Sequence, residues 1–141
     1  MQQITSLGMA EAQKAIEVIQ TEMLKRGKAA VIVVADPHGE LIALLRVDGA
    51  PFTSIQIAMN KAYTAARERK PSREIGQRSR DPERGFDLAN FGDPKIVGWG
   101  GGLPVVLNGE VLGAIGVSGL PEVEDIELSQ MGVEAILAGV K

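Results

Sequence analysis

The chain has 141 residues, of which 45% are apolar; this is enough for one domain with a buried core and argues against disorder. Its formal net charge of −3 gives no electrostatic reason to expect nucleic acid or an anionic membrane as a partner. The absence of cysteine and the presence of one histidine exclude disulfides, thiolate nucleophiles and a multi-histidine metal site within one subunit. We therefore predict a single domain over residues 1–141 without a metal site.

The N-terminal part predicts a helix followed by a β-hairpin. Apolar residues recur at three and four positions over roughly 6–26, which is typical of a helix with one buried face. The β-branched segment 29–35 predicts a strand buried on both faces, and 41–47 predicts the returning strand. Between them, Pro37-His38-Gly39 has the composition of a turn.

A second helix is predicted to begin at Ser54 and to end before Pro71, because proline disfavours helical backbone at the residue before it. Thr53 and Gln56 have the spacing of a capping box. The inner stripe of this helix contains mostly small residues: Ile55, Ala58, Ala62 and Ala65. Such a helix can lie close against a sheet.

Residues 71–98 are the least regular part of the sequence, with several prolines and glycines and a weak helical pattern over 72–78. A segment of this length without strong periodicity is usually functional or mobile in a compact domain. It is also rich in arginine.

The C-terminal part predicts a second hairpin and a final helix. Asn108-Gly109 lies between the apolar segments 103–107 and 110–117, which is a strong hairpin signal because both turn residues tolerate positive φ. The last helix begins near Pro121, with acidic residues in its first turn. The predicted order is α-β-β-α-irregular-β-β-α, an α+β fold whose short hairpin links favour an antiparallel sheet.

An ordered set of short motifs carries a family resemblance. They are Val33-Val34-Ala35-Asp36, Gly39-Glu40-Leu41, Arg46-Val47-Asp48-Gly49-Ala50-Pro51, Lys61-Ala62-Tyr63-Thr64-Ala65, Gly101-Gly102-Leu103-Pro104 and the segment from Asn108 to Gly119. Together they cover nearly the whole chain, which resembles the GlcG/HbpS family, including the C-terminal domain of PduO. The resemblance implies a profilin-like or PAS-like domain, a homo-oligomer that is often an octamer, and haem or corrinoid as a ligand. It also implies haem breakdown in some members and roles in the degradation of organic acids and aromatic compounds in others.

Two polar sets lie on the first hairpin and the second helix. Arg46 and Asp48 are two apart on a strand and so face the same way; they form either a carboxylate clamp with a base or a structural ion pair. Lys61, Thr64 and Arg67 lie on one side of the second helix. They face either a ligand pocket, in which Lys61 is a candidate catalytic residue that moves a proton and Thr64 and Arg67 bind the ligand, or a subunit interface.

A third set surrounds the only tryptophan. Trp99 precedes Gly100, Gly101 and Gly102, whose exposed amides can cradle an anion while the indole stacks on a planar ligand. Arg73, in the arginine-rich segment, is a candidate for holding a carboxylate.

Two further residues complete the predictions. Asp125 follows the Ser118-Gly119 turn and is a candidate base, although the helix dipole also explains an acidic residue there. His38, at a hairpin tip, is predicted to be exposed and non-catalytic. We expect the ends of the strands, and not the tips of the hairpins, to form the site.

These features lead to three functional hypotheses. The first is a small-molecule binding protein for haem, a corrinoid or another anionic planar compound. The second is a metal-independent enzyme acting on a small hydroxy- or oxo-acid of the muconate type, with tautomerase, hydrolase or deaminase chemistry. The third is an oligomeric accessory subunit. In each case the N-terminus, which lacks a secretory pattern, favours a cytoplasmic protein. The mild net charge predicts no nucleic-acid or membrane partner.

Overall fold

Four strands form one antiparallel sheet in the computed structural model, which describes residues 1–140. The strands are β1 (Val31–Ala35), β2 (Leu41–Arg46), β3 (Gly102–Leu107) and β4 (Glu110–Ser118). Their order across the sheet is β2-β1-β4-β3, so the two hairpins lie side by side through β1 and β4. The antiparallel prediction is therefore confirmed.

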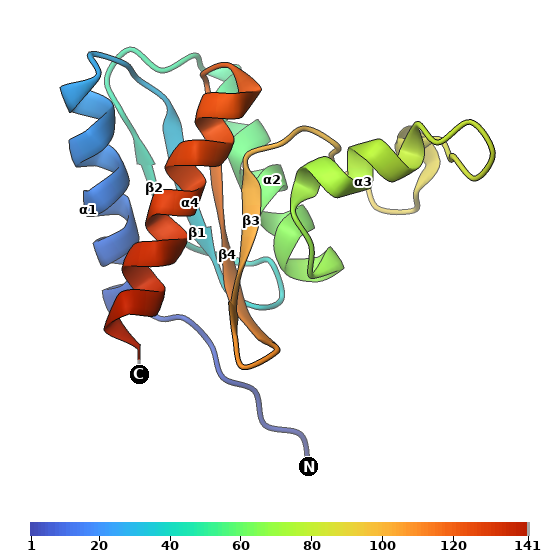
Figure 1. The fold of residues 1–141 in the computed structure, drawn as a ribbon, viewed down its shortest axis with the longest axis horizontal. Coiled ribbons are helices and arrows are strands. Elements are labelled where there is room, and N and C mark those ends of the chain that lie inside the picture. Colours follow the sequence, from blue (N-terminus) through green and yellow to red (C-terminus); the bar gives the residue numbers. More distant parts are fainter. Residues whose placement is uncertain (141) are drawn as a thin grey trace.

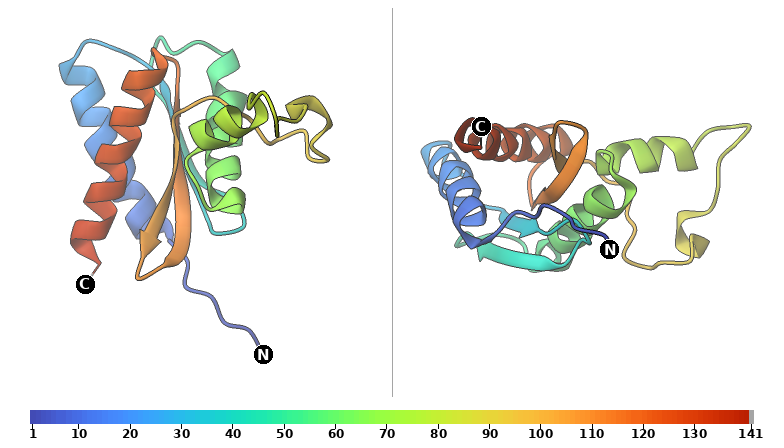
Figure 2. Two further views of the ribbon diagram at one scale, coloured as in Figure 1. Left: turned by 45° about the vertical axis from the view of Figure 1, so that its right-hand side comes forward. Right: turned by 90° about the horizontal axis from the view of Figure 1, so that it is seen from below.

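Helices cover both faces of this sheet (Figures 1 and 2). The helices α1 (Met9–Lys25) and α4 (Glu122–Gly139) lie side by side on one face. The helix α2 (Thr53–Glu68) lies on the other face, with α3 (Ser72–Ser79) beyond it. The short 3₁₀ helix η1 (Leu88–Asn90) belongs to an arm, residues 80–95, that projects away from the sheet.

Strand β1 shows why the sheet needs helices on both sides. All five of its residues are buried, and alternate side chains of a strand point to opposite faces. Ile32 and Val34 pack in the core beneath α1 and α4, whereas Val31, Val33 and Ala35 pack against α2. The continuous β-branched segment in the sequence therefore marks the centre of the molecule.

Alanine and glycine bring α2 unusually close to the sheet. Ala58 and Ala62 are fully buried, as the predicted inner stripe requires. A Cβ atom at Gly116 of β4 would lie 2.3 Å from the carbonyl oxygen of Ala58, a distance that no real contact allows. Backbone therefore meets backbone between α2 and β4.

Some local predictions were wrong in detail. The capping box at Thr53 does not form, because the N-cap of α2 is Phe52 and no side chain caps it. Helix α1 begins at Met9, where the Gly8 amide donates to Glu11 Oε1 at 2.8 Å, and not at residue 6. In contrast, the weak helical pattern over 72–78 is confirmed, because these residues form the helix α3. Within residues 1–140, no helix is both long and apolar enough to cross a membrane.

Candidate functional site

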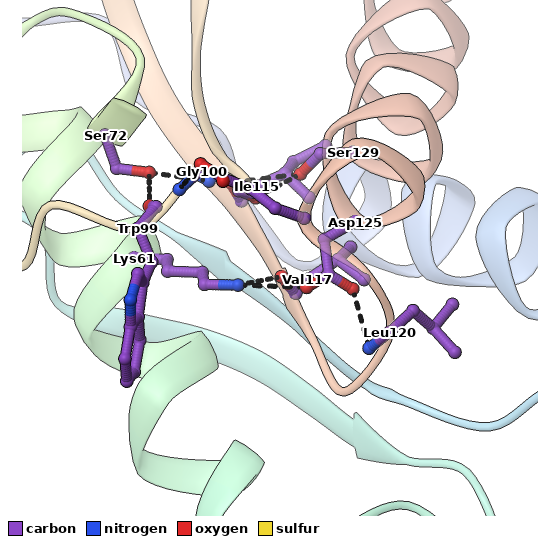
Figure 3. A network of polar contacts seen from close by, with 12 residues as sticks. Lys61, Ser72, Trp99, Gly100, Ile115, Val117, Leu120, Asp125 and Ser129 are labelled. Carbon is purple, nitrogen blue, oxygen red and sulfur yellow. Dashed lines mark hydrogen bonds and ion pairs between the residues drawn. The ribbon is translucent and has the colours of Figure 1, made fainter. Parts of the chain in front are cut away.

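A buried ion pair lies at one end of the sheet. Lys61 of α2 and Asp125 of α4 are 3% and 2% exposed, and Lys61 Nζ lies 3.1 Å from Asp125 Oδ2 (Figure 3). Lys61 also donates to the carbonyl oxygen of Val117 at 3.0 Å, and Asp125 Oδ1 accepts from the amide of Leu120 at 3.1 Å. The pair thus connects helices on opposite faces past the end of β4.

Burial dominates the electrostatics of this pair. Loss of water raises the pKa of Asp125 above its ordinary value, and the nearby Lys61 ammonium and the Leu120 amide oppose that rise. A buried pair of this kind contributes little net stability, but removing one partner is costly because it leaves an uncompensated charge. Each of the two residues therefore depends on the other for its buried position.

Glycines at the start of β3 make room for the pair. A Cβ atom at Gly101 would lie 2.9 Å from Lys61 Nζ and 3.1 Å from Asp125 Cβ, and one at Gly102 would lie 2.2 Å from the Lys61 carbonyl oxygen. Gly101 also has φ of +125°, a conformation that favours glycine. These glycines are explained by close packing.

The proposed anion cradle at the glycine run does not form as predicted. The Gly100 amide donates to Glu122 Oε1 at 2.7 Å, and the Gly102 amide donates to Ser72 Oγ at 3.0 Å. Ser72 in turn donates to the Trp99 carbonyl oxygen at 2.5 Å. Side chains of the protein therefore already occupy two of the three amides that the predicted cradle needs.

Two hollows meet at Trp99, whose residue surface is 59% exposed. The first, about 410 Å³, contains the Lys61–Asp125 pair and is called the ion-pair hollow below. It is lined by Pro51, Thr53, Ser54, Ile57, Lys61, Trp99, Gly100, Ser118, Gly119, Leu120, Glu122 and Asp125. The second, about 520 Å³, is the apolar hollow at the base of the arm, lined by Arg80, Leu88, Ala89, Pro94, Ile96, Val97, Gly98 and Trp99.

The structure separates Arg46 and Asp48 from this pair of hollows. They line a third hollow, of about 520 Å³, with the end of α1. The end of β2 and the start of β3 do lie at the same end of the sheet, but these are the two outer strands. The strand-end residues that we expected to form one site are therefore divided between separate hollows. Arg46 instead lies over the ring of Phe52, 5.5 Å from its centre.

The other predicted ligand-binding residues lie outside both hollows. Thr64 is fully buried, accepts from the Val97 amide at 3.0 Å and donates to the Lys95 carbonyl oxygen at 3.3 Å. Arg67 donates to the His38 carbonyl oxygen at 2.8 Å and lies over the ring of Tyr63. Their hydrogen bonds hold the arm and the first hairpin turn against α2.

The two remaining predictions concern exposed residues. Arg73 is exposed in the first turn of α3 and lines neither hollow. The His38 side chain is 66% exposed at the hairpin turn and lies near Arg69 and Glu110. Within residues 1–140, no three His, Cys, Asp or Glu side chains gather as metal ligands would.

Sequence reasoning missed three residues of the ion-pair hollow as ligand contacts. Glu122 was counted only among the acidic residues of a first helical turn, Ser118 only as part of a turn, and Ser54 only as a helix start. Each is a common residue in a turn or first helical turn, so no pattern distinguishes it. Only their shared position around the hollow reveals them.

Comparisons with known proteins agree with the fold. The family model described as "Haem degrading protein HbpS-like" matches residues 7–134. A Citrobacter freundii protein, described as an uncharacterized 15.0 kDa protein in the dhaT-dhaS intergenic region, is 35% identical over 94% of each chain. The crystal structure of Klebsiella pneumoniae ORFY has a TM-score of 0.91 and 30% identity, over 98% of this chain and 95% of that one.

A more distant structure, the PduOC:heme complex, has a TM-score of 0.85 at 22% identity, over 93% of this chain and 95% of that one, and shows the shared fold. The family match covers nearly the whole chain and confirms the resemblance to GlcG/HbpS. The chain belongs to the HbpS-like family.

Proposed function

We propose that the protein binds a planar, anionic small molecule against Trp99. The observation that carries this proposal is the meeting of two hollows at one exposed indole, with Arg80 as the charged residue that lines the apolar one. An indole face provides a large contact area for a planar ligand. A guanidinium provides paired donors for a carboxylate.

Haem is the ligand that the family description suggests, and the related PduOC structure is titled as a heme complex. The apolar hollow suits a porphyrin edge, and Arg80 suits a propionate. The residues lining these two hollows include no histidine, cysteine, methionine or tyrosine to ligate the iron. The residues therefore fit the macrocycle but not protein ligation of iron by those groups, and the same holds for a corrinoid cobalt.

A haemin titration tests the proposal, because Trp99 is the only tryptophan. We expect haemin to quench its fluorescence at micromolar protein. For Trp99→Ala, haemin binding is measured from the Soret band of haemin. We expect this variant to bind haemin about threefold to tenfold more weakly, because the aromatic contact is lost. His38→Ala serves as the control and should bind as the unaltered protein does. A Soret shift without tryptophan quenching, or one that His38→Ala abolishes, would place haem elsewhere.

A homo-oligomer, implied by the resemblance, stays a proposal. Strand β2 lies at the edge of the sheet, and unpaired edges favour association with another chain. Leu41 at the start of this strand is exposed, and so is Phe52, which lies beside Arg46 at its other end. Both features support contacts between copies of the chain.

The Lys61–Asp125 pair also favours a second candidate, a tautomerase for small hydroxy- or oxo-acids. Asp125 would accept the hydroxyl proton of an enol, and the same proton would return to the adjacent carbon, so no other reactant is needed. A carboxyl group with a raised pKa suits this exchange.

Phenylpyruvate, whose enol and keto forms differ in absorbance, is a direct test of the second candidate. We expect Asp125→Asn to lower catalysed ketonisation at least a hundredfold, the usual contribution of a general base. Lys70→Met, at an exposed position in no ion pair of the described residues, is the control. Catalysis retained in Asp125→Asn would contradict the assignment.

A further inference from the structure

We infer that the ion-pair hollow receives neutral hydroxyl groups of the ligand, while the ligand carboxylate lies at Arg80 in the apolar hollow. The ligand class is then a planar aromatic carboxylate with hydroxyl groups on the side opposite the carboxylate. This inference rests on the proposed function, since it fixes the orientation of a ligand that lies against Trp99.

Two buried serines carry the first part of the argument. Ser54, in the first turn of α2, and Ser118, at the end of β4, are each 4% exposed and line the ion-pair hollow. Within residues 1–140 neither hydroxyl takes part in a side-chain hydrogen bond, in contrast to the buried Ser72 and Ser129 nearby. Neither hydroxyl oxygen is among the fully buried atoms that lack a partner, so both are open to the hollow and can pair with water or with a polar group of a ligand. Ligand hydroxyls, which both donate and accept, would satisfy both serines.

The charges of the ion-pair hollow favour a neutral ligand group over the ligand carboxylate. Its ionic side chains are Lys61, Asp125 and Glu122, which sum to −1 when all three are charged. Lys61 is already engaged by Asp125, so no free cation remains for an anion. Glu122 Oε1 accepts a hydrogen bond from the Gly100 amide, and its second oxygen can accept a hydrogen bond from a ligand. A ligand hydroxyl meets this need, whereas a ligand carboxylate would be repelled.

The apolar hollow has the opposite character. Arg80 is its one charged lining residue, is exposed, and forms no salt bridge within residues 1–140. Apolar side chains such as Leu88, Pro94 and Ile96 form most of the remaining wall. Because Trp99 lines both hollows, the inference places the ligand ring against its indole, with one end of the ligand toward each hollow.

Three small probes separate the two ends of the ligand. In 3,4-dihydroxybenzoate the carboxylate and the vicinal hydroxyls lie at opposite ends of one ring; benzoate lacks the hydroxyls and catechol lacks the carboxylate. By isothermal titration calorimetry we expect 3,4-dihydroxybenzoate to bind at least tenfold more tightly than either fragment. Equal or tighter binding of benzoate would overturn the inference.

Matched variants then assign each end. Ser54→Ala and Ser118→Ala should each weaken 3,4-dihydroxybenzoate about twofold to tenfold, the range for one lost hydrogen bond, and leave benzoate unchanged. Arg80→Gln should weaken benzoate and 3,4-dihydroxybenzoate about tenfold and leave catechol unchanged. Ser6→Ala, at an exposed position outside the hollows, is the control.

The outcomes distinguish this inference from the proposed function. If haemin or benzoate binds at Trp99 but the serine variants affect all three probes equally or none, the inference is wrong and the proposed function stands. If neither haemin, benzoate nor 3,4-dihydroxybenzoate produces binding heat or changes Trp99 emission, both are wrong.

Discussion

Replacing Lys61 by methionine is expected to lower the free energy of unfolding at neutral pH by about 3–5 kcal/mol, the usual cost of leaving one buried charge without its partner. Asp125 is 2% exposed and its Oδ2 faces Lys61 Nζ at 3.1 Å. Methionine fills a similar volume, so the loss reports the charge and not a cavity. Urea unfolding followed by circular dichroism measures this change.

The double variant Lys61→Met/Asp125→Asn provides the decisive control. Asparagine keeps an oxygen that can accept from the Leu120 amide and removes the stranded charge. We expect the double variant to be more stable than Lys61→Met alone. Lys70→Met, at an exposed position, should unfold like the unaltered protein within about 0.5 kcal/mol. A double variant less stable than the single one would contradict the ion-pair explanation.

The free energy of unfolding of Lys61→Met should also show a characteristic pH dependence. Burial raises the pKa of Asp125 above its ordinary 3.8, and Lys61 opposes that rise; without Lys61 the folded pKa should rise further. A carboxyl whose folded pKa exceeds its unfolded value favours the folded state at low pH, and this contribution is lost as pH rises through the folded pKa. The penalty of Lys61→Met should therefore be largest above that pKa and should shrink as the solution is acidified through it.

Replacing Gly102 by alanine is expected to lower the free energy of unfolding by about 3 kcal/mol, the upper range for forcing an extra group into a packed site. The added Cβ would lie 2.2 Å from the Lys61 carbonyl oxygen and 2.7 Å from its carbon. Because these are backbone atoms, β3 and α2 must move apart, which also disturbs the ion pair and the Ser72 contact. Chemical denaturation measures the loss, and weaker ligand binding should accompany it.

Gly139→Ala is the matched control for this substitution. A Cβ there would closely meet only the flexible end of Lys14, at the exposed last position of α4. Alanine in a helix is favoured over glycine by up to about 1 kcal/mol, so stability should be unchanged or slightly higher. A similar loss in both variants would mean that the tight α2–β3 contact is not the cause.

The sequence predicted much of the fold because its signals are local. The β-branched segment around Val33, the Asn108-Gly109 turn and the alanine stripe of the second helix each describe their own surroundings. The turn has positive φ at both residues, +51° and +80°, as its composition predicts. The prediction was wrong at Thr53, because Phe52 already has helical backbone angles and Thr53 is therefore the first residue of the helix and not its cap.

Candidate site residues were harder to predict, because their roles depend on neighbours that are distant in the chain. Lys61 and Asp125 were singled out separately, and only the packing of α2 and α4 around β4 brings them together. Thr64 and Arg67 share the helix with Lys61, but their hydrogen bonds go to the arm and the hairpin turn. Helical spacing gives the direction of a side chain but not what lies there.

The sequence by itself determined the antiparallel α+β architecture, the family and the small residues that allow close packing, because periodicity, turn chemistry and residue size act over short distances. The tertiary structure alone decided that β1 and β4 are neighbours. Arg46 and Trp99 therefore lie near opposite edges of the sheet, beside the outer strands β2 and β3. It also decided that Ser54, Ser118 and Glu122 surround one hollow. The physical reason is that strand order and helix docking are set by burial of the whole core, to which every segment contributes at once.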